Sequence, residues 1–464
     1  MLSKGIRRYF NRTAVRSVRE RGSRVDKFKL AEKSRVREIL LTNPELTRAV
    51  AAHAAAHGLS SDKVWSRVEE YIAEIIPSFN ILAYYRFGYV LSRSVLNFFY
   101  KVSAEHHPAW SGKPLPRNAI VIYLMNHRSN ADYLLVGYVL SGKVAISYAV
   151  GEWARAFPLE YIFKSFGSYF IRRKYREPLY HSVLEHYVQL ITREGVTQGI
   201  FPEGGLTRDG KLRPGKIGLL DYMLGVARDE GYRNRIYLVP VAINYDRVLE
   251  DRTLLRELAR SEGHRQTPKR KQLYEVSRYV WWNTARMVFR RWKRYGRAAV
   301  TVGEPLQVAQ WFDELHRSGT NLFDLSRHAR LAEVQSLCDQ MMSRIGAIIP
   351  VTPVPLACAA IQSLDSDFVS RERLLARMSE MRDVLLELNA RVIRAEGEID
   401  EIFERAWKML RMRKILVRSG DGYVVLPKNR GLISYYANSI AHLLGPFEQG
   451  VRESDALPSS RIVT

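Results

Sequence analysis

The sequence predicts an α/β protein in which a mainly parallel sheet is flanked by helices, with further helical regions at both ends of the chain. Three observations support this fold class. Short apolar runs rich in β-branched residues alternate with helix-like runs between residues 101 and 305. Polar side chains crowd directly after the first run, where open α/β sheets bind their ligands. The flanking regions carry apolar residues at helical spacing instead.

The chain begins with a strongly basic segment, for which we expect an arm over residues 1–37. A partly disordered solvated arm, an electrostatic tether to an anionic membrane and a mitochondrial presequence are three interpretations. Acidic residues at Glu20 and Asp26 favour the first two over a presequence. The basic residues are Lys4, Arg7, Arg8, Arg12, Arg16, Arg19, Arg21, Arg24, Lys27 and Lys29.

Residues 38–76 predict a small helical domain, since Asn43-Pro44 can start one helix and Ser60–Asp62 can cap the next. The α/β domain is expected over 77–350. Its opening segment, Pro77–Tyr100, is rich in aromatic residues, which we interpret as a core helix, with an interfacial helix as the alternative.

Five strands and four helices are expected within the α/β domain. The strands are Ala119–Met125, Tyr169–Ile171, Gly199–Phe201, Tyr237–Ile243 and Ala298–Val302. The helices lie around 133–140, 155–165, 178–194 and 216–230. Residues 264–294 interleave basic residues with tryptophan, which suits a membrane interface, a packed helix with a basic edge, or nucleic acid.

A helical C-terminal domain is expected over 351–464, where apolar residues recur at helical spacing from Leu374 to Leu388. Ser419–Gly422 separates two strand-like runs and predicts a hairpin. A hairpin beside helices is also found in winged-helix DNA-binding proteins, so a nucleic-acid-binding protein is the alternative from another functional class.

The composition limits the partners. A net charge of +24 attracts anions, whether phosphate substrates, nucleic acid or anionic lipid. The two cysteines, Cys338 and Cys358, have no metal-ligand spacing and indicate a reducing compartment. No stretch offers 18 uncharged apolar residues, so we expect the chain to touch a membrane rather than to span it.

The candidate catalytic pair is His127 and Asp132, which follow the strand Ala119–Met125. On a regular helix these two residues would face different sides, so they can meet only if His127 lies in the turn before the helix. Asp132 could then hold one ring nitrogen and leave the other free as a base. A helix cap beside an ordinary turn histidine explains the same spacing.

Three further blocks follow in order, Gly167-Ser-Tyr-Phe-Ile-Arg-Arg173, Phe201-Pro-Glu-Gly-Gly-Leu-Thr-Arg208 and Val239-Pro-Val241. With His127 and Asp132, the chain resembles the glycerol-phosphate acyltransferase family in all four of its motifs. The third block departs from the family, because it lacks one basic residue and has threonine where serine is usual. That departure leaves the acceptor open.

The resemblance implies roles for particular residues. It assigns His127 as general base, oriented by Asp132, and phosphate binding to Arg172, Arg173 and Arg208. Arg128 is a further candidate for the phosphate because it lies beside the base. Bidentate guanidinium groups suit phosphate oxygens. The other implied substrate-binding residues are Glu203, Gly204, Gly205, Thr207 and Pro240.

The implied reaction is transfer of a fatty acyl group from acyl-CoA or acyl-carrier protein to the 1-hydroxyl of glycerol 3-phosphate, giving lysophosphatidate. Dihydroxyacetone phosphate and a lysophosphatidate are the alternative acceptors, and an inactive scaffold is a further alternative. We expect no cofactor, no metal and no nucleic-acid partner. An anionic membrane surface is the expected partner, with peripheral attachment at the cytoplasmic face of the cell membrane.

Overall fold

The computed structural model describes residues 33–77, 89–107, 114–140, 146–151, 163–164, 167–172, 175–261 and 294–445. Several expectations lie outside these residues: most of the basic arm, residues 78–88 of the aromatic segment 77–100, most of the helix at 155–165, nearly all of the basic and tryptophan-rich run 264–294, and Arg173.

The core is one eight-stranded sheet, in the order β1-β7-β6-β2-β5-β3-β4, with β8 paired to β6. Strands β2, β3, β4, β5 and β6 run parallel, whereas β7 is antiparallel to β6 and parallel to β1 at the edge. The mainly parallel sheet is therefore confirmed. The strands are β1 (Lys101–His106), β2 (Ile120–Met125), β3 (Ser147–Gly151), β4 (Tyr169–Ile171), β5 (Gln198–Ile200), β6 (Ile236–Tyr245), β7 (Arg297–Val302) and β8 (Leu306–Gln307).

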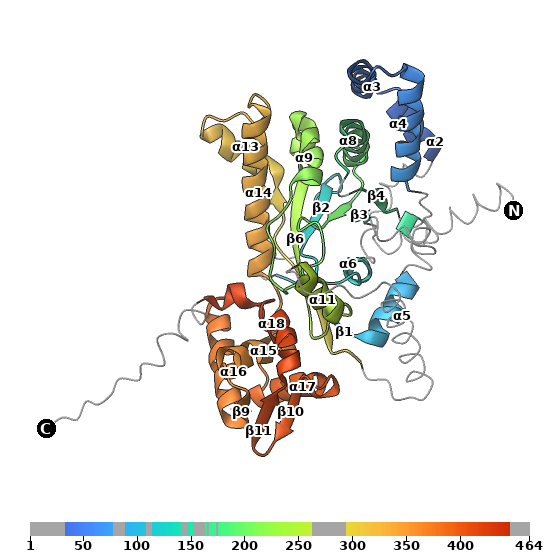
Figure 1. The fold of residues 1–464 in the computed structure, drawn as a ribbon. Helices are drawn as coiled ribbons and strands as arrows, with labels where there is room; N and C mark the ends of the chain where they lie inside the picture. The colour runs from blue at the N-terminus through green and yellow to red at the C-terminus, as the bar shows by residue number, and fades with distance from the viewer. Residues whose placement is uncertain are drawn as a thin grey trace.

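Helices cover both faces of this sheet, as an α/β architecture requires. On one face α8, α9 and α14 pack in a row, and on the other α6 packs with α5 (Figure 1). Strand β2 is buried at every residue between these layers. The bounds of the helices are α5 (Tyr89–Phe99), α6 (Asp132–Leu140), α8 (Pro178–Arg193), α9 (Gly218–Leu224), α10 (Glu230–Arg233), α11 (Asp251–Ser261), α13 (Val308–Arg317) and α14 (Arg327–Ala347), with the short 3-10 turn η4 (Gly225–Arg228).

Three helices precede the sheet: α2 (Lys33–Leu41), α3 (Pro44–His57) and α4 (Ser61–Ile75). Asn43 caps α3 through its side chain, as the Asn-Pro pair predicts. Helices α3 and α4 pack on α8, beside the β4 edge of the sheet (Figure 1). Helix α2 begins at Lys33, so the boundary expected at residue 37 falls inside a helix.

The C-terminal part forms a separate layer below the sheet, joined to it by the long helix α14 (Figure 1). It contains α15 (Pro353–Ser363), α16 (Arg371–Glu387), α17 (Ile399–Met412), α18 (Arg430–Ala437) and the short 3-10 turns η5 (Pro427–Asn429) and η6 (Ala441–Leu443). The expected hairpin is present as β10 (Leu416–Ser419) and β11 (Gly422–Val425), and β9 (Phe368–Ser370) adds a third strand to it.

Strands β1 and β3 were not predicted. Strand β1 is a half-exposed edge strand of mixed polarity, so it lacks the apolar run that marks a buried strand. Strand β3 follows an apolar helix so closely that the sequence does not separate the two. Among the described residues, no helix is long and apolar enough to cross a membrane.

Candidate active site

Three parallel strands end together at the candidate site. Strand β2 lies between β5 and β6, so the residues after Met125 and Ile200 meet at one edge of the sheet, beside the end of β6. The side chain of Asn126 prolongs the β2–β6 pairing, because its amide donates to the carbonyl of Ile243 at 2.9 Å and accepts the Ile243 N–H at 2.7 Å. This side chain ends the strand and starts the turn that carries His127.

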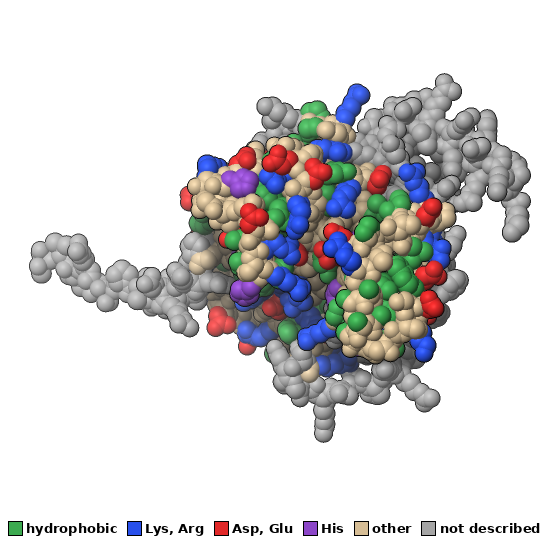
Figure 2. All heavy atoms as spheres, turned by 90° about the horizontal axis from the view of Figure 1, so that it is seen from above, with side chains coloured by type: hydrophobic (Ala, Val, Ile, Leu, Met, Phe, Trp, Pro, Cys, Tyr) green, Lys and Arg blue, Asp and Glu red, His purple; other side chains and the backbone are tan. Residues whose placement is uncertain are grey.

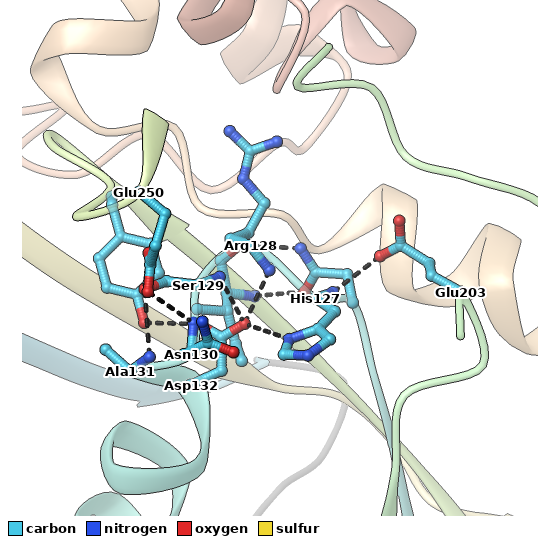
Figure 3. A network of polar contacts seen from close by, with 11 residues as sticks. His127, Arg128, Ser129, Asn130, Ala131, Asp132, Glu203 and Glu250 are labelled. Atoms are coloured by element: carbon cyan, nitrogen blue, oxygen red, sulfur yellow. Dashed lines mark hydrogen bonds and ion pairs between the residues drawn. The ribbon is translucent and has the colours of Figure 1, made fainter. Parts of the chain in front are cut away.

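Asp132 is the first residue of α6 and organises that turn. Its Oδ2 accepts the N–H groups of Arg128 at 2.7 Å and Ser129 at 3.0 Å, two amides of the turn that precedes the helix. The same oxygen lies 3.0 Å from Nδ1 of His127 (Figure 3). The expected pair therefore meets in the turn before the helix, and the catalytic role of the pair stays a prediction.

Aromatic rings hold the imidazole of His127 in place, in addition to the contact between its Nδ1 and Asp132. It stacks on the ring of Phe201 at 4.1 Å between centroids and meets the edge of Tyr133. With Nδ1 turned to Asp132, Nε2 has no hydrogen-bond partner within the described parts of the chain. A neutral ring held in this way presents Nε2 as a proton acceptor.

Glu203, at the end of β5, holds the backbone of the catalytic turn. Its carboxylate accepts the N–H of His127 at 2.7 Å and that of Arg213 at 3.2 Å. Burial raises the pKa of Glu203 to about 7, against these two hydrogen bonds and the nearby Arg128, which lower it. We expected Glu203 to accept from the acceptor hydroxyl or to hold an arginine; here both carboxylate oxygens accept from the protein's own backbone.

Arg128 is buried beside the base, at 3% exposure. Its Nη1 donates to the carbonyl of Gly210, and its guanidinium lies over the ring of Tyr435 from α18, 5.2 Å from the centroid. Its Nε and Nη2 have no hydrogen-bond partner among the described residues. These two donors lie on one edge of the guanidinium, the edge that grips a carboxylate or phosphate in a bidentate manner.

Two residues beyond the predicted set complete the turn. The hydroxyl of Tyr245 donates to Oδ1 of Asp132 at 2.6 Å. Glu250 accepts from the Ser129 hydroxyl at 2.7 Å and from the Asn130 N–H at 3.2 Å, and burial raises the pKa of its carboxyl. Tyr245 ends β6 and Glu250 follows it closely, so the only signal was their nearness to the fourth block.

The third block forms a tight loop over the site. The N–H of Thr207 donates to the carbonyl of His127 at 3.3 Å, while its hydroxyl donates to Asp209. Gly204 has a φ of 69°, a value that favours glycine, and half-buried Gly205 follows it. Arg208 is exposed and lies 3.5 Å from a carboxylate oxygen of Glu257, in contrast to the buried Arg128.

Two predicted residues lie apart from the base. Arg172 forms a bidentate ion pair with Glu74 of α4, with Nε at 2.9 Å from Oε1, and three tyrosine rings surround it. It ends β4, three strands from β2, which at about 4.8 Å per strand is roughly 14 Å away. Pro240 is inside β6, where the partner changes from β8 to β7, so the sheet tolerates its missing N–H. Neither side chain joins the cluster around His127.

Two family models match the chain. Residues 109–244 match the acyltransferase model, and residues 282–446 match the model described as glycerol-3-phosphate acyltransferase C-terminal region. The chain thus contains an acyltransferase domain.

Curated relatives match over most of the chain. It is 26% identical to the glycerol-3-phosphate acyltransferase of Pseudoalteromonas translucida over 437 residues, covering 89% of this chain and 50% of that protein. The protein of the same name from Aeromonas hydrophila is 26% identical over 423 residues, with the same coverage. The chain spans about half the length of these relatives. Among solved structures, a 1-acyl-sn-glycerophosphate acyltransferase from Thermotoga maritima aligns with 57% of this chain and 78% of its own, at 16% identity and a TM-score of 0.31.

Proposed function

Because the family models and the named relatives assign this chain to the glycerol-3-phosphate acyltransferase family, we propose that it transfers a fatty acyl group from a thioester to the 1-hydroxyl of glycerol 3-phosphate. The product is lysophosphatidate and a free thiol. Acyl-CoA and acyl-carrier protein both supply the required thioester, and no cofactor takes part.

The chemistry follows from the held imidazole. Nε2 of His127 takes the proton of the acceptor hydroxyl as the oxygen attacks the thioester carbonyl. Asp132 stabilises the imidazolium through Nδ1. The tetrahedral intermediate expels the thiolate, which receives the proton that His127 holds. The oxygen–carbon bond forms, the carbon–sulfur bond breaks, and the base returns to its neutral state.

The observation that carries the proposal is the pairing of this base with the buried donors of Arg128. A buried guanidinium is costly unless its donors are paired, and a phosphate pairs both Nε and Nη2 at once. His127 and Arg128 are consecutive residues, so an alcohol whose phosphate binds Nε and Nη2 of Arg128 would be held close to the imidazole of His127. Arg208 and Arg173 remain as further candidates for the phosphate.

A radiolabelled acyl-transfer assay tests the proposal. The full chain is given acyl-CoA or acyl-carrier protein with glycerol 3-phosphate, dihydroxyacetone phosphate, lysophosphatidate or unphosphorylated glycerol. We expect glycerol 3-phosphate to be the best acceptor and His127→Ala to lose activity by a factor of about a thousand or more. Transfer to none of these acceptors, or substantial activity in His127→Ala, would refute the proposal.

We further propose that the reaction occurs at an anionic membrane surface, on the cytoplasmic face. Support comes from the net charge of +24 and the basic residues of 1–37. On the described surface seen from above, basic and acidic side chains are interspersed (Figure 2). Binding should appear on vesicles that contain phosphatidylglycerol and be absent on neutral vesicles. It should weaken in 0.5 M salt, where the electrostatic screening length falls to roughly half of its physiological value. Equal binding to neutral vesicles, or none at low salt, contradicts this.

A further inference from the structure

Two consecutive acidic residues, Glu250 and Asp251, face opposite sides at the start of α11. Glu250 turns to the catalytic turn, where it accepts from the Ser129 hydroxyl and the Asn130 N–H (Figure 3). Asp251 turns to the C-terminal domain. The segment 248–251 therefore lies between the turn that carries His127 and a separate domain of the chain.

The Asp251 side is a closed cluster of polar groups, the Asp251 cluster, formed with Arg413 and Tyr436. Arg413 follows α17 and reaches Asp251 with both Nη atoms, at 2.6 and 2.8 Å. The hydroxyl of Tyr436, on α18, donates to Asp251 and accepts the N–H of Val248 at 3.1 Å. The side chains of Arg413 and Asp251 are exposed by only 5% and 3%.

Because the Asp251 cluster is buried, its charged groups must stay paired with one another. Breaking one member of a buried ion pair leaves the other charge without compensation, so the geometry of all three groups is strongly determined. Since Tyr436 binds both ends of the segment 248–251, the C-terminal domain fixes the segment as a unit. Glu250 is part of that unit, and its two hydrogen bonds pass the constraint to the turn after His127.

The same helix also supports the anion-binding edge. The Tyr435 ring lies against the Arg128 guanidinium, and the amide of Asn438 donates to the carbonyl of Asp209 at 2.8 Å. Asp209 precedes Gly210, whose carbonyl accepts from Arg128. The C-terminal domain thus contacts the segment 248–251 through Tyr436 and the guanidinium through Tyr435.

We propose that Arg413 and Tyr436 are positioning residues for His127. The C-terminal domain then contributes to the acyltransferase site by holding the base in place. This inference rests on the proposed function. Neither residue touches the reacting atoms; each acts through Asp251 and Glu250. Loss of the Asp251 cluster should lower kcat, because the base is misplaced, and should leave the acceptor KM nearly unchanged, because Arg128 is held by other contacts.

Tyr436→Phe tests this with the removal of one oxygen atom. The matched control is Tyr423→Phe, in the same domain, where the Tyr423 hydroxyl accepts from Arg371 at 2.9 Å and Arg371 pairs with Asp400 and Glu404. Within the described parts of the chain, that cluster makes no hydrogen bond or ion pair with the turn that carries His127. Circular dichroism first establishes that both variants are folded. We then expect the kcat of Tyr436→Phe to fall about tenfold and that of Tyr423→Phe to stay within about twofold of the wild-type value. Equal kcat in the two variants would overturn the inference.

A second measurement does not need turnover. A proton shared between Nδ1 of His127 and Asp132 should give a low-field proton resonance, which His127→Ala removes. In Tyr436→Phe this resonance should broaden or shift, and in Tyr423→Phe it should remain. Arg413→Lys, which keeps the charge, should give an intermediate effect, whereas Arg413→Met should be the strongest. A wild-type chain that transfers no acyl group would refute the proposed function, while an unchanged resonance in every variant would refute the coupling.

Discussion

The hydroxyl of Tyr245 donates to Oδ1 of Asp132 at 2.6 Å, the carboxylate oxygen that His127 does not use. Each oxygen of this buried carboxylate therefore has its own donors, and the plane of the carboxylate is fixed on both sides. Tyr245 ends β6, so the strand beside β2 determines how the acid faces the base. The geometry of the proposed catalytic pair thus depends on two neighbouring strands, not only on the turn that contains both residues.

Tyr245→Phe should lower kcat about tenfold, because a hydrogen bond to a charged group contributes about 1.5–3 kcal/mol and its loss frees the carboxylate to rotate. Steady-state kinetics at a saturating concentration of acceptor measure the change in kcat.

The control is Tyr100→Phe. Tyr100 is equally buried, and its ring lies 5.3 Å from that of Tyr245, but its hydroxyl donates to the carbonyl of Arg247 instead of Asp132. Its kcat should match that of the wild type once folding is equal. A loss of kcat of the same size in both variants would show that the effect comes from general loosening of the core.

The sequence predicted site residues well where they lie in one continuous stretch of the chain. His127, Asp132 and Arg128 lie within six residues, and their turn geometry follows from a strand that runs into a helix. Tyr245 and Glu250 were not predicted as site residues, because their roles depend on β6 lying beside β2. No local sequence pattern specifies the order of strands in a sheet.

Arg172 is a residue that the sequence predicted in the site but that the structure places elsewhere. Its motif pointed to phosphate, yet its position depends on α4, which brings Glu74 to it from a distant part of the chain. The site predictions for Gly204, Gly205, Thr207, Arg208 and Pro240 stay predictions as substrate contacts, although the structure places the third block directly over His127.

Glu203 should make stability depend on pH. An ordinary glutamate ionises near 4.5, whereas burial raises the pKa of Glu203 to about 7. Between these values the unfolded chain releases its proton first, so the free energy of unfolding falls as pH rises, by about 3 kcal/mol from this group. Glu203→Gln should flatten that fall. Urea unfolding at pH 5, 6, 7 and 8 measures the slope.

Glu230→Gln is the matched control, since the Glu230 side chain is 82% exposed and its change should leave the slope as in the wild type. If Glu203→Gln unfolds with the same pH dependence as the wild type, Glu203 does not titrate in this range. Activity of Glu203→Gln should fall in either case, because one acceptor for the N–H groups of His127 and Arg213 is lost.

Gly210→Ala should detach α18 from the site. Gly210 has a φ of 88°, and an added Cβ would lie 1.9 Å from the carbonyl oxygen of Tyr435. Left-handed strain costs about 1–2 kcal/mol and the overlap about 1–3 kcal/mol more. Gly58→Ala, at a φ of 62° with open space around it, carries the strain alone. Urea unfolding should show a larger loss for Gly210→Ala, together with a raised acceptor KM; equal losses in the two variants would contradict the close packing.

The last prediction separates Arg128 from Arg172 as candidates for binding the phosphate. Arg128→Lys replaces a fork with a point charge, so the acceptor KM for glycerol 3-phosphate should rise about tenfold to a hundredfold, while unphosphorylated glycerol should be used as well as by the wild type. Arg172 already pairs with Glu74, so Arg172→Lys should leave that KM within about twofold and act mainly on stability.

Comparing the two acceptors in each variant isolates the phosphate, because general damage to the site lowers the use of both alcohols equally. A rise in KM for Arg172→Lys alone would mean that Arg172 leaves Glu74 to bind the phosphate and that the buried donors of Arg128 serve another purpose. A rise confined to Arg128→Lys would place the phosphate on the residue next to the base, where the acceptor's hydroxyl can reach Nε2 of His127.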